Sequence, residues 1–336
     1  MRYRHDVCLL TNIKSVLLAM AIFSLALFLA ACTEDGGMES TLPVPPVPPM
    51  PPVPLASEPV DLRVPIAPSQ VLVPTTGNEY LSQRGATIDT SNKADGYVMV
   101  RYTGGTARGV IVLVEREVRY VYDLDISGNW EVFPLTMGSG EYRISVLENV
   151  GGRNFAMLAS VTTNVTLRDE RLPFLHPNQL VNFNSESKVV ELAESLAQGA
   201  RNDHDVITSI FEFVIDNIEY DFDFARAVSE GIITSHIPDV DATLASGRGI
   251  CFDYASLMAA MLRAQKIPTR LEIGYVSGTV YHAWVSVYIC DVGWILAISY
   301  DGTKWTRYDP TFSAGSNGAA AAFIGDGTNY NTMFKH

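Results

Sequence analysis

The chain has few cysteines, few histidines and little charge for its 336 residues, and each shortage excludes a class of function. The four Cys and six His show no zinc-site spacing, and the acidic residues show no calcium-loop spacing, so we expect no metal and no cofactor. The net charge is −13, and no basic run offsets it, which argues against nucleic acid as a partner. Hydrophobic residues, at 47%, are plentiful enough for a sizeable core.

Residues 1–31 have the pattern of an export signal and are left out of the fold. A basic start precedes an apolar run, and small residues lead directly into Cys32. This junction, "LAAC", resembles the bacterial lipoprotein signal, in which the cysteine becomes the lipid-bearing first residue of the mature protein. An uncleaved transmembrane anchor is the alternative, because the apolar run is just long enough to span a bilayer. In both cases we expect the rest of the chain outside the cytoplasm, held at the cell membrane.

Two further regions precede the C-terminal half. Residues 32–85 are predicted to be a disordered stalk, because the proline-rich stretch 41–60 favours extended polyproline II. A spacer is the simpler role for it, and a ligand for a partner domain is the alternative. Residues 86–170 alternate short β-branched and aromatic runs with glycine-rich breaks, which predicts a small all-β sandwich. We find no catalytic constellation in this module, so a structural or substrate-presenting role is expected, with carbohydrate binding as an open alternative.

Residues 171–336 are predicted to form an α+β domain. Helical periodicity marks 187–200 and 203–221, whereas 222–248 shows none and is expected to be irregular. A helix headed by Cys251 follows, and then β-type runs continue to residue 312. The Gly/Ala-rich tail after them is expected to wrap the surface.

Cys251 follows a Gly-Arg-Gly turn and begins a stretch with helical spacing. A thiol at a helix N-terminus meets unpaired backbone N–H groups and the positive end of the helix dipole, and both favour the thiolate. Gly249 would let the chain turn tightly into the helix and leave space for a substrate backbone. A small buried core residue, or one half of a disulfide with Cys290, is the alternative for Cys251. We expect Cys290 to be free and buried.

A nucleophilic cysteine needs a base, and the base needs an orienting acid. His282 begins the apolar strand "HAWVSVY", where a histidine can also be an ordinary packing residue. Asp309 lies in "RYDPTF", where an Asp-Pro step is also ordinary turn chemistry. The other histidines lie in the leader, in loops, at a charged helix start or in the tail.

Together the three segments resemble the transglutaminase-like superfamily, whose core has a papain-like architecture. "GICFDYASLMAAMLRAQKIPTR" is similar to the family's nucleophile helix, "GYVSG…YHAWVSVY" to its histidine strand and "WTRYDPTF" to its aspartate strand. The resemblance covers roughly residues 187–312. The family commonly has a polar or acidic residue shortly after "HAW", where this chain has Val285 and Ser286, and that difference bears on substrate preference.

The resemblance implies a role for each matching residue. Cys251 would attack a carboxamide or peptide carbonyl, His282 would move the proton, and Asp309 would orient His282. The Cys251 backbone N–H would stabilise the oxyanion, with Tyr220 as a second donor, unless that tyrosine is only a core residue. Asp253 and Trp284 would shape the site.

The expected function is therefore that of an extracytoplasmic cysteine enzyme acting on amide or peptide bonds of proteins or peptides, such as those of the cell envelope. It would work through a thioester, resolved by water in a protease or amidase and by an amine in an acyltransferase. The alternative is a non-catalytic cell-surface binding protein that keeps the fold.

Overall fold

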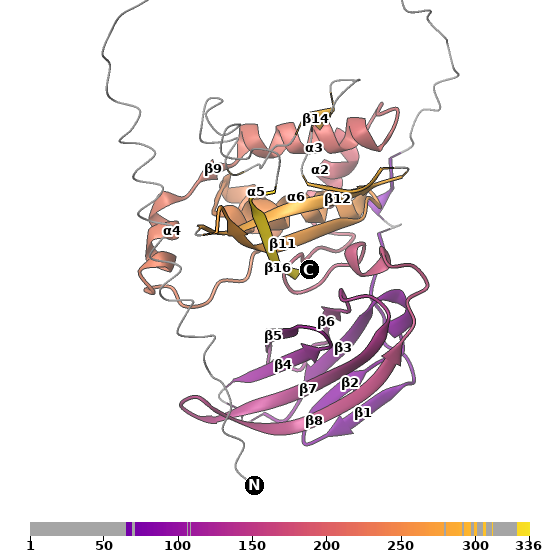
Figure 1. Cartoon of the computed structure of the whole chain (residues 1–336), viewed down its shortest axis with the longest axis vertical. Helices are drawn as coiled ribbons and strands as arrows, with labels where there is room; N and C mark the ends of the chain where they lie inside the picture. Colours follow the sequence, from indigo (N-terminus) through magenta and orange to yellow (C-terminus); the bar gives the residue numbers. More distant parts are fainter. Residues whose placement is uncertain are drawn as a thin grey trace, which may run out of the picture.

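The computed structural model describes residues 65–68, 71–105, 107, 109–278, 280–290, 292–296, 299–300, 305–306, 311 and 328–336. They form two parts, which Figure 1 shows one above the other: an all-β part, which we call the sandwich, and a mixed part of helices and strands. Within these ranges, no helix combines the length and the apolar character needed to cross a membrane.

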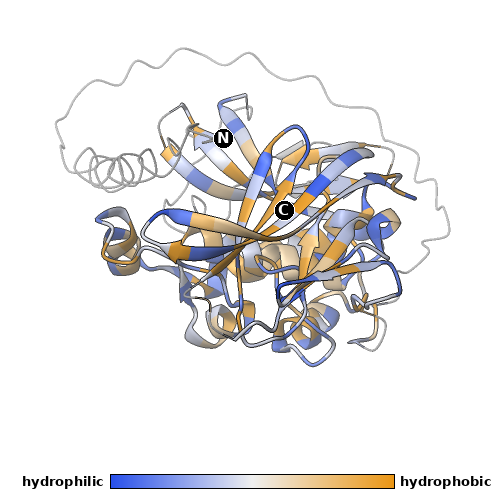
Figure 2. Cartoon of the chain, turned by 90° about the horizontal axis from the view of Figure 1, so that it is seen from below, coloured by the Kyte–Doolittle hydropathy of each residue, from blue (hydrophilic) through white to orange (hydrophobic). Residues whose placement is uncertain are grey.

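The sandwich consists of two four-stranded antiparallel sheets, ordered β1-β2-β3-β6 and β5-β4-β7-β8. Its strands are β1 (Tyr80–Gln83), β2 (Ala86–Asp89), β3 (Tyr97–Tyr102), β4 (Val110–Glu115), β5 (Arg119–Leu124), β6 (Glu131–Pro134), β7 (Gly140–Gly151) and β8 (Asn154–Val165). Alternate side chains enter one shared core, so polar and apolar bands alternate along the ribbons in Figure 2. The predicted all-β sandwich is confirmed.

The first strand lies before the predicted start of the sandwich at residue 86. β1 pairs antiparallel with β2, so the stalk prediction extends too far. Three of the four β1 side chains are exposed, and the strand lies at a sheet edge. Such a strand has no apolar alternation, which is why its sequence resembles a linker.

Three helices make up the core of the mixed part: α2 (Lys188–Leu196), α3 (Asp203–Asn217) and α6 (Cys251–Ala264). Every residue of α6 except Phe252 is buried, because the helix lies between the other helices and the sheet. The predicted helices over 187–200 and 203–221 are confirmed, although both are shorter than expected.

The stretch 222–248 was expected to be irregular, and that prediction is wrong. It contains α4 (Phe222–Ser229) and α5 (Val240–Ser246). Each begins with an aspartate cap, at Asp221 and Asp239, whose side chain accepts a backbone N–H. With eight and seven residues and few buried side chains, neither helix is long enough to show an apolar period.

An antiparallel sheet ordered β13-β12-β11-β16 packs against α6, and Figure 1 shows the sheet beside that helix. The strands of the mixed part are β9 (Glu219–Tyr220), β10 (Arg248–Gly249), β11 (Thr269–Val276), β12 (Val280–Ile289), β13 (Gly293–Leu296), β14 (Ser299–Tyr300), β15 (Trp305–Thr306) and β16 (Tyr330–Lys335). The short β9 and β10 pair in parallel, and β14 pairs with β15. The predicted α+β class is confirmed.

The C-terminal tail was expected to wrap the surface, but residues 330–335 form β16 at the edge of the sheet. Gly274 of β11 permits this pairing, because a Cβ there would lie 2.0 Å from the Asn331 backbone oxygen. The segment "YNTMFKH" is too short for its pattern of apolar and polar side chains to distinguish an edge strand from an irregular tail. Residues 312–327 lie outside the described ranges.

A buried arginine holds the C-terminus where it meets the sandwich. Arg263 of α6 donates to the backbone carbonyls of Thr269, His176 and His336 at 2.7–3.0 Å. Burial lowers the pKa of Arg263 to about 9, so the group keeps its charge at neutral pH. The ring Nδ1 of His336 lies 3.1 Å from the Tyr122 hydroxyl of the sandwich. The last strand therefore contacts both parts of the molecule.

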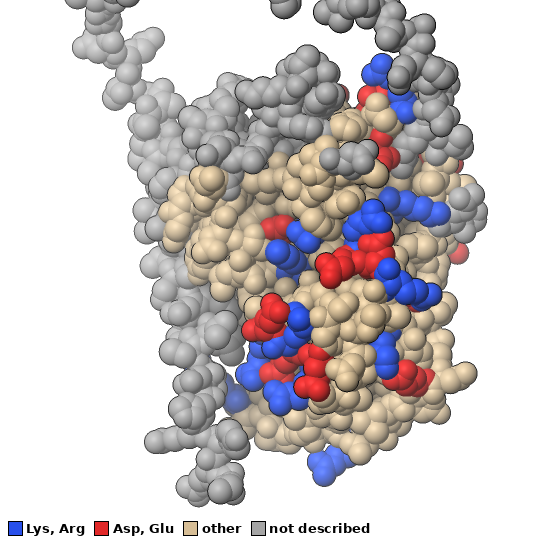
Figure 3. Space-filling model, turned by 45° about the vertical axis from the view of Figure 1, so that its right-hand side comes forward, with Lys and Arg blue, Asp and Glu red and all other residues tan. Residues whose placement is uncertain are grey.

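The surface carries charges of both signs. On the face shown in Figure 3, basic and acidic side chains are interspersed, and the described residues there form no broad patch of one sign. Arg119 and Arg143 also form ion pairs with Glu115, at 2.7 and 2.9 Å. Such pairs contribute little to stability.

Candidate active site

Cys251 is the first residue of α6, as the sequence predicts. The side chain is 6% exposed, and the thiol is free. The chain enters the helix through Ile250, whose backbone N–H donates to the Asp253 carboxylate at 2.9 Å. The thiol thus lies at the N-terminal end of a buried helix, where backbone N–H groups without intrahelical partners can bind an oxyanion.

Gly249 has another role than the one expected from the sequence. Its backbone does not adopt the left-handed region, whereas Gly247, at φ 62°, makes the tight turn after α5. A Cβ on Gly249 would lie 2.6 Å from the Cβ of Asp253. The space that was assigned to a substrate is therefore filled by the aspartate that caps the helix.

Tyr220 lies beside the start of α6, because β9 pairs with β10 and places it opposite Gly249. The tyrosine is half-buried, and its ring centroid lies 4.9 Å from that of Phe222 and 6.5 Å from that of Tyr254. These contacts place the residue next to the nucleophile helix. Its role as an oxyanion donor stays a prediction.

His282 lies on β12 and is 4% exposed. Its ring stacks near that of Trp284, with centroids 6.2 Å apart and planes at 24°. Strand alternation places these two side chains on one face, whereas Ala283 and Val285 join the core around α6. The pairing of His282 with Cys251 stays a prediction, as does the site-shaping role of Trp284.

Two predicted residues lie outside the described ranges: Asp309, the expected orienting acid, and Cys32, the expected site of lipid attachment. Only Ser286–Ile289 of β12 pair with β13, so among the described residues the first half of β12 has β11 as its paired strand.

Tyr281 is a neighbour of Cys251 that the sequence did not indicate. It shares the α6 side of β12 with Ala283, and its ring packs edge-on against Tyr275 at 5.5 Å. Burial, together with charge on Tyr275 and Cys251, raises the pKa of Tyr281 to about 12. The phenol therefore stays protonated at neutral pH.

His236 is a second residue near Cys251 that the sequence did not indicate, because it lies in a loop. Its Nε2–H donates to Asp253 Oδ1 at 2.6 Å, and the other Asp253 oxygen accepts from Ile250. Asp253 thus caps the helix and holds a loop, which gives its predicted site-shaping role a physical form. No local pattern around His236 could have revealed a partner 17 residues away.

Cys290 is free, as expected, but exposed rather than buried. β12 ends at Ile289, so the cysteine lies in the turn beyond the strand rather than on its buried face. Cys251 is also free, and no disulfide therefore blocks it in the structure.

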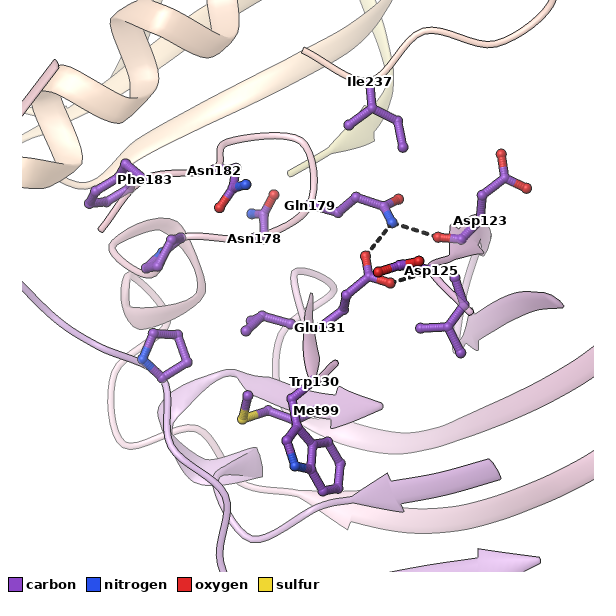
Figure 4. Close-up of a pocket in the computed structure, with 14 residues that line it drawn as sticks. Met99, Asp123, Asp125, Trp130, Glu131, Asn178, Gln179, Asn182, Phe183 and Ile237 are labelled. Carbon is purple, nitrogen blue, oxygen red and sulfur yellow. Dashed lines mark hydrogen bonds between the residues drawn. The ribbon is translucent and has the colours of Figure 1, made fainter. Parts of the chain in front are cut away.

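A cavity of about 560 Å³ lies elsewhere, between the sandwich and the segment around Gln179. Figure 4 shows Gln179 donating to Glu131 and to the Asp123 backbone, and Ile237 also lines the cavity. Burial, reinforced by Asp125 and Asp123, raises the pKa of Glu131. None of the predicted site residues that the structure describes lines this cavity. Among the described residues, no group of three or more His, Cys, Asp or Glu side chains is arranged to hold a metal.

The structure thus places a free cysteine at the first position of a buried helix, and a buried histidine on the antiparallel sheet that packs against this helix. Residues 190–310 match the family model of the transglutaminase-like superfamily, and we assign a transglutaminase-like domain to this part of the chain. The predicted resemblance to this family is confirmed.

Several solved structures are similar to the chain at low identity. A proposed cysteine protease from Cytophaga hutchinsonii is 18% identical over 64% of this chain and 74% of its own, with a TM-score of 0.33. The periplasmic domain of TgpA from Pseudomonas aeruginosa is 18% identical over 71% of this chain and 95% of its own, with a TM-score of 0.29. No curated protein matches the sequence.

Proposed function

We propose that the protein is an extracytoplasmic, lipid-anchored cysteine enzyme that acts on amide or peptide bonds of proteins or peptides. The observation that carries the proposal is the free Cys251 thiol at the start of α6, inside the transglutaminase-like domain. A helix start is a favourable place for a thiolate and supplies N–H donors for the oxyanion.

The proposed reaction has two halves. His282 takes the thiol proton of Cys251 while the sulfur attacks the carbonyl carbon, and the resulting oxyanion is bound by the Cys251 N–H and by Tyr220. The C–N bond then breaks, the amine leaves with the proton from His282, and a thioester remains on the sulfur. Asp309 holds His282 in the productive orientation.

Water or an amine completes the cycle. Either one attacks the thioester carbonyl, His282 takes its proton, and the thiol is regenerated as the C–S bond breaks. Water gives a carboxylic acid and an amine gives a new amide, so the same residues serve a protease, an amidase or an acyltransferase. The export signal and Cys32 support a substrate in the cell envelope.

Trapping the thioester tests this proposal. The protein is mixed with a denatured protein substrate, quenched in acid and mapped by mass spectrometry, with Cys251→Ala as the control. We expect an acyl group on Cys251, and its conversion to a hydroxamate by hydroxylamine. A tagged amine and isotope-labelled water in parallel samples distinguish transfer from hydrolysis. Binding of the same substrate without any acyl group on Cys251 would instead support the non-catalytic binding protein.

A further inference from the structure

The segment 219–239 is attached at both ends to the residues that flank Cys251. At its start, the Asp221 N–H donates to the Gly249 carbonyl at 2.9 Å, two residues before the cysteine. At its end, the His236 Nε2–H donates to Asp253 at 2.6 Å, two residues after it. The segment therefore forms a loop around the start of the nucleophile helix, and we call it the α4 loop.

The His236 attachment is built into the fold. Asp253 is buried, and its carboxylate oxygens accept from the His236 ring and from the Ile250 backbone. The imidazole also packs edge-on against Phe224 of α4, with centroids 4.8 Å apart, and lies 6.3 Å from Phe252 of α6. One ring thus links the loop, α4 and the nucleophile helix.

Between its two attachments, the α4 loop exposes large apolar side chains. Phe222 is 48% exposed and Ile232 72%. The only buried residue of α4 is Ser229, so the helix contributes little to the core. Phe222 directly follows Asp221, and its ring centroid lies 4.9 Å from that of Tyr220, which lies opposite Gly249. Ile237, just beyond His236, instead lines the cavity beside the sandwich (Figure 4). Exposed apolar groups on a loop attached beside a reactive cysteine are typical of a surface that binds an apolar group.

We propose that the α4 loop is the specificity wall of the site and receives an apolar or aromatic side chain of the acyl donor, next to the carbonyl that Cys251 attacks. This inference rests on the proposed function, because it assigns the substrate class of that same cysteine. His236 is a positioning residue: it does not touch the reacting atoms but fixes the loop to Asp253. Substrates with an apolar residue beside the reactive carbonyl are preferred over substrates with a polar one.

The test uses the full-length protein and two peptidyl chloromethyl ketones that differ only in carrying phenylalanine or serine beside the reactive carbonyl. Iodoacetamide, which has no side chain to place, reports the intrinsic reactivity of Cys251. The rate of labelling at Cys251 is measured by peptide mapping for each reagent, and the ratio of the two ketone rates gives the selectivity. We expect the phenylalanine reagent to react about tenfold faster or more, since burying one large apolar group has an effect of that order.

Variants separate the wall from its attachment. Ile232→Asp places a charge on the wall, and Val121→Asp on β5, at a residue 59% exposed, is the matched control. We expect Ile232→Asp to lower the selectivity about tenfold by weakening the apparent affinity for the phenylalanine reagent, and Val121→Asp to leave it unchanged. His236→Ala should also lower the selectivity, whereas His236→Gln, which keeps a donor for Asp253, should restore most of it. Because the selectivity is a ratio of two ketone rates for one variant, a change in the intrinsic reactivity of Cys251, which iodoacetamide reports, does not enter it.

Two results overturn the proposal. One is equal labelling of the wild type by the phenylalanine and serine reagents. The other is a loss in His236→Ala or Ile232→Asp that is the same for both reagents. Failure of the proposed function is distinguishable, because Cys251 would then react with iodoacetamide no faster than Cys290, whatever the selectivity of the ketones.

Discussion

Mild acid should destabilise the protein through two buried histidines at the junction of its two parts. His336 contacts the Tyr122 hydroxyl, and His176 packs against Tyr97 with ring centroids 4.7 Å apart. Burial lowers the pKa of His336 to about 3 and that of His176 to about 4, with the Arg263 charge adding to the effect on both. Both rings are therefore neutral in the folded protein at pH 5.

The sign and size of the effect follow from linkage. In the unfolded chain both rings titrate near 6.5, so the unfolded state binds more protons than the folded state below that pH. The stabilisation is complete above pH 6.5 and is lost as the pH falls toward the folded values. Lowering the pH from 7 to 5 should reduce the free energy of unfolding by about 2 kcal/mol for each histidine and by about 4 kcal/mol for the pair. Glu131, with its raised pKa, acts in the opposite direction at lower pH.

Urea unfolding at pH 7 and pH 5, followed by tryptophan fluorescence, measures this loss. His176→Leu keeps the backbone carbonyl that Arg263 uses and removes one titrating ring, so the loss should shrink by about 2 kcal/mol. His336→Phe tests the other half in the same way. A free energy of unfolding that is equal at the two pH values in the wild type, or a loss unchanged in both variants, would refute the linkage.

Two substitutions test how the last strand and the buried arginine hold the mixed part together. Gly274→Ala should lower the free energy of unfolding by about 1–3 kcal/mol, because its Cβ meets the Asn331 carbonyl, and should speed amide exchange in β16. Gly109→Ala, with no atom within 4 Å of the new Cβ, is the control and should have little effect. Arg263→Met should cost about 2–4 kcal/mol in urea unfolding, because three buried carbonyls lose their donor. Arg263→Lys should recover only part of that loss, since one ammonium cannot reproduce the planar fork.

The parts of the fold that the sequence indicated are those with a long local period. The start of α6 was predictable because small and apolar residues follow Cys251 at helical spacing, and the sandwich because its strands alternate. Short elements such as α4, α5 and β1 could not be predicted, since each has too few buried side chains to show a period.

The contacts that the sequence could not indicate are those made by distant segments. The His236–Asp253 pair depends on a loop that returns to the start of α6. The buried position of His336 depends on β16 joining β11. The predicted burial of Cys290 is wrong because β12 ends one residue before it. A difference of one residue in the end of a strand decides between a buried and an exposed side chain.

The nucleophile assignment is tested most directly by comparing the two free cysteines in one sample. The protein is treated with limiting iodoacetamide at pH 6, and alkylation of Cys251 and Cys290 is followed by peptide mapping. Although Cys251 is buried and Cys290 exposed, we expect Cys251 to react faster, and His282→Ala to remove that advantage. Alkylation of Cys251 no faster than Cys290, or a rate at Cys251 that His282→Ala leaves unchanged, would contradict the assignment of Cys251 and His282 as nucleophile and base.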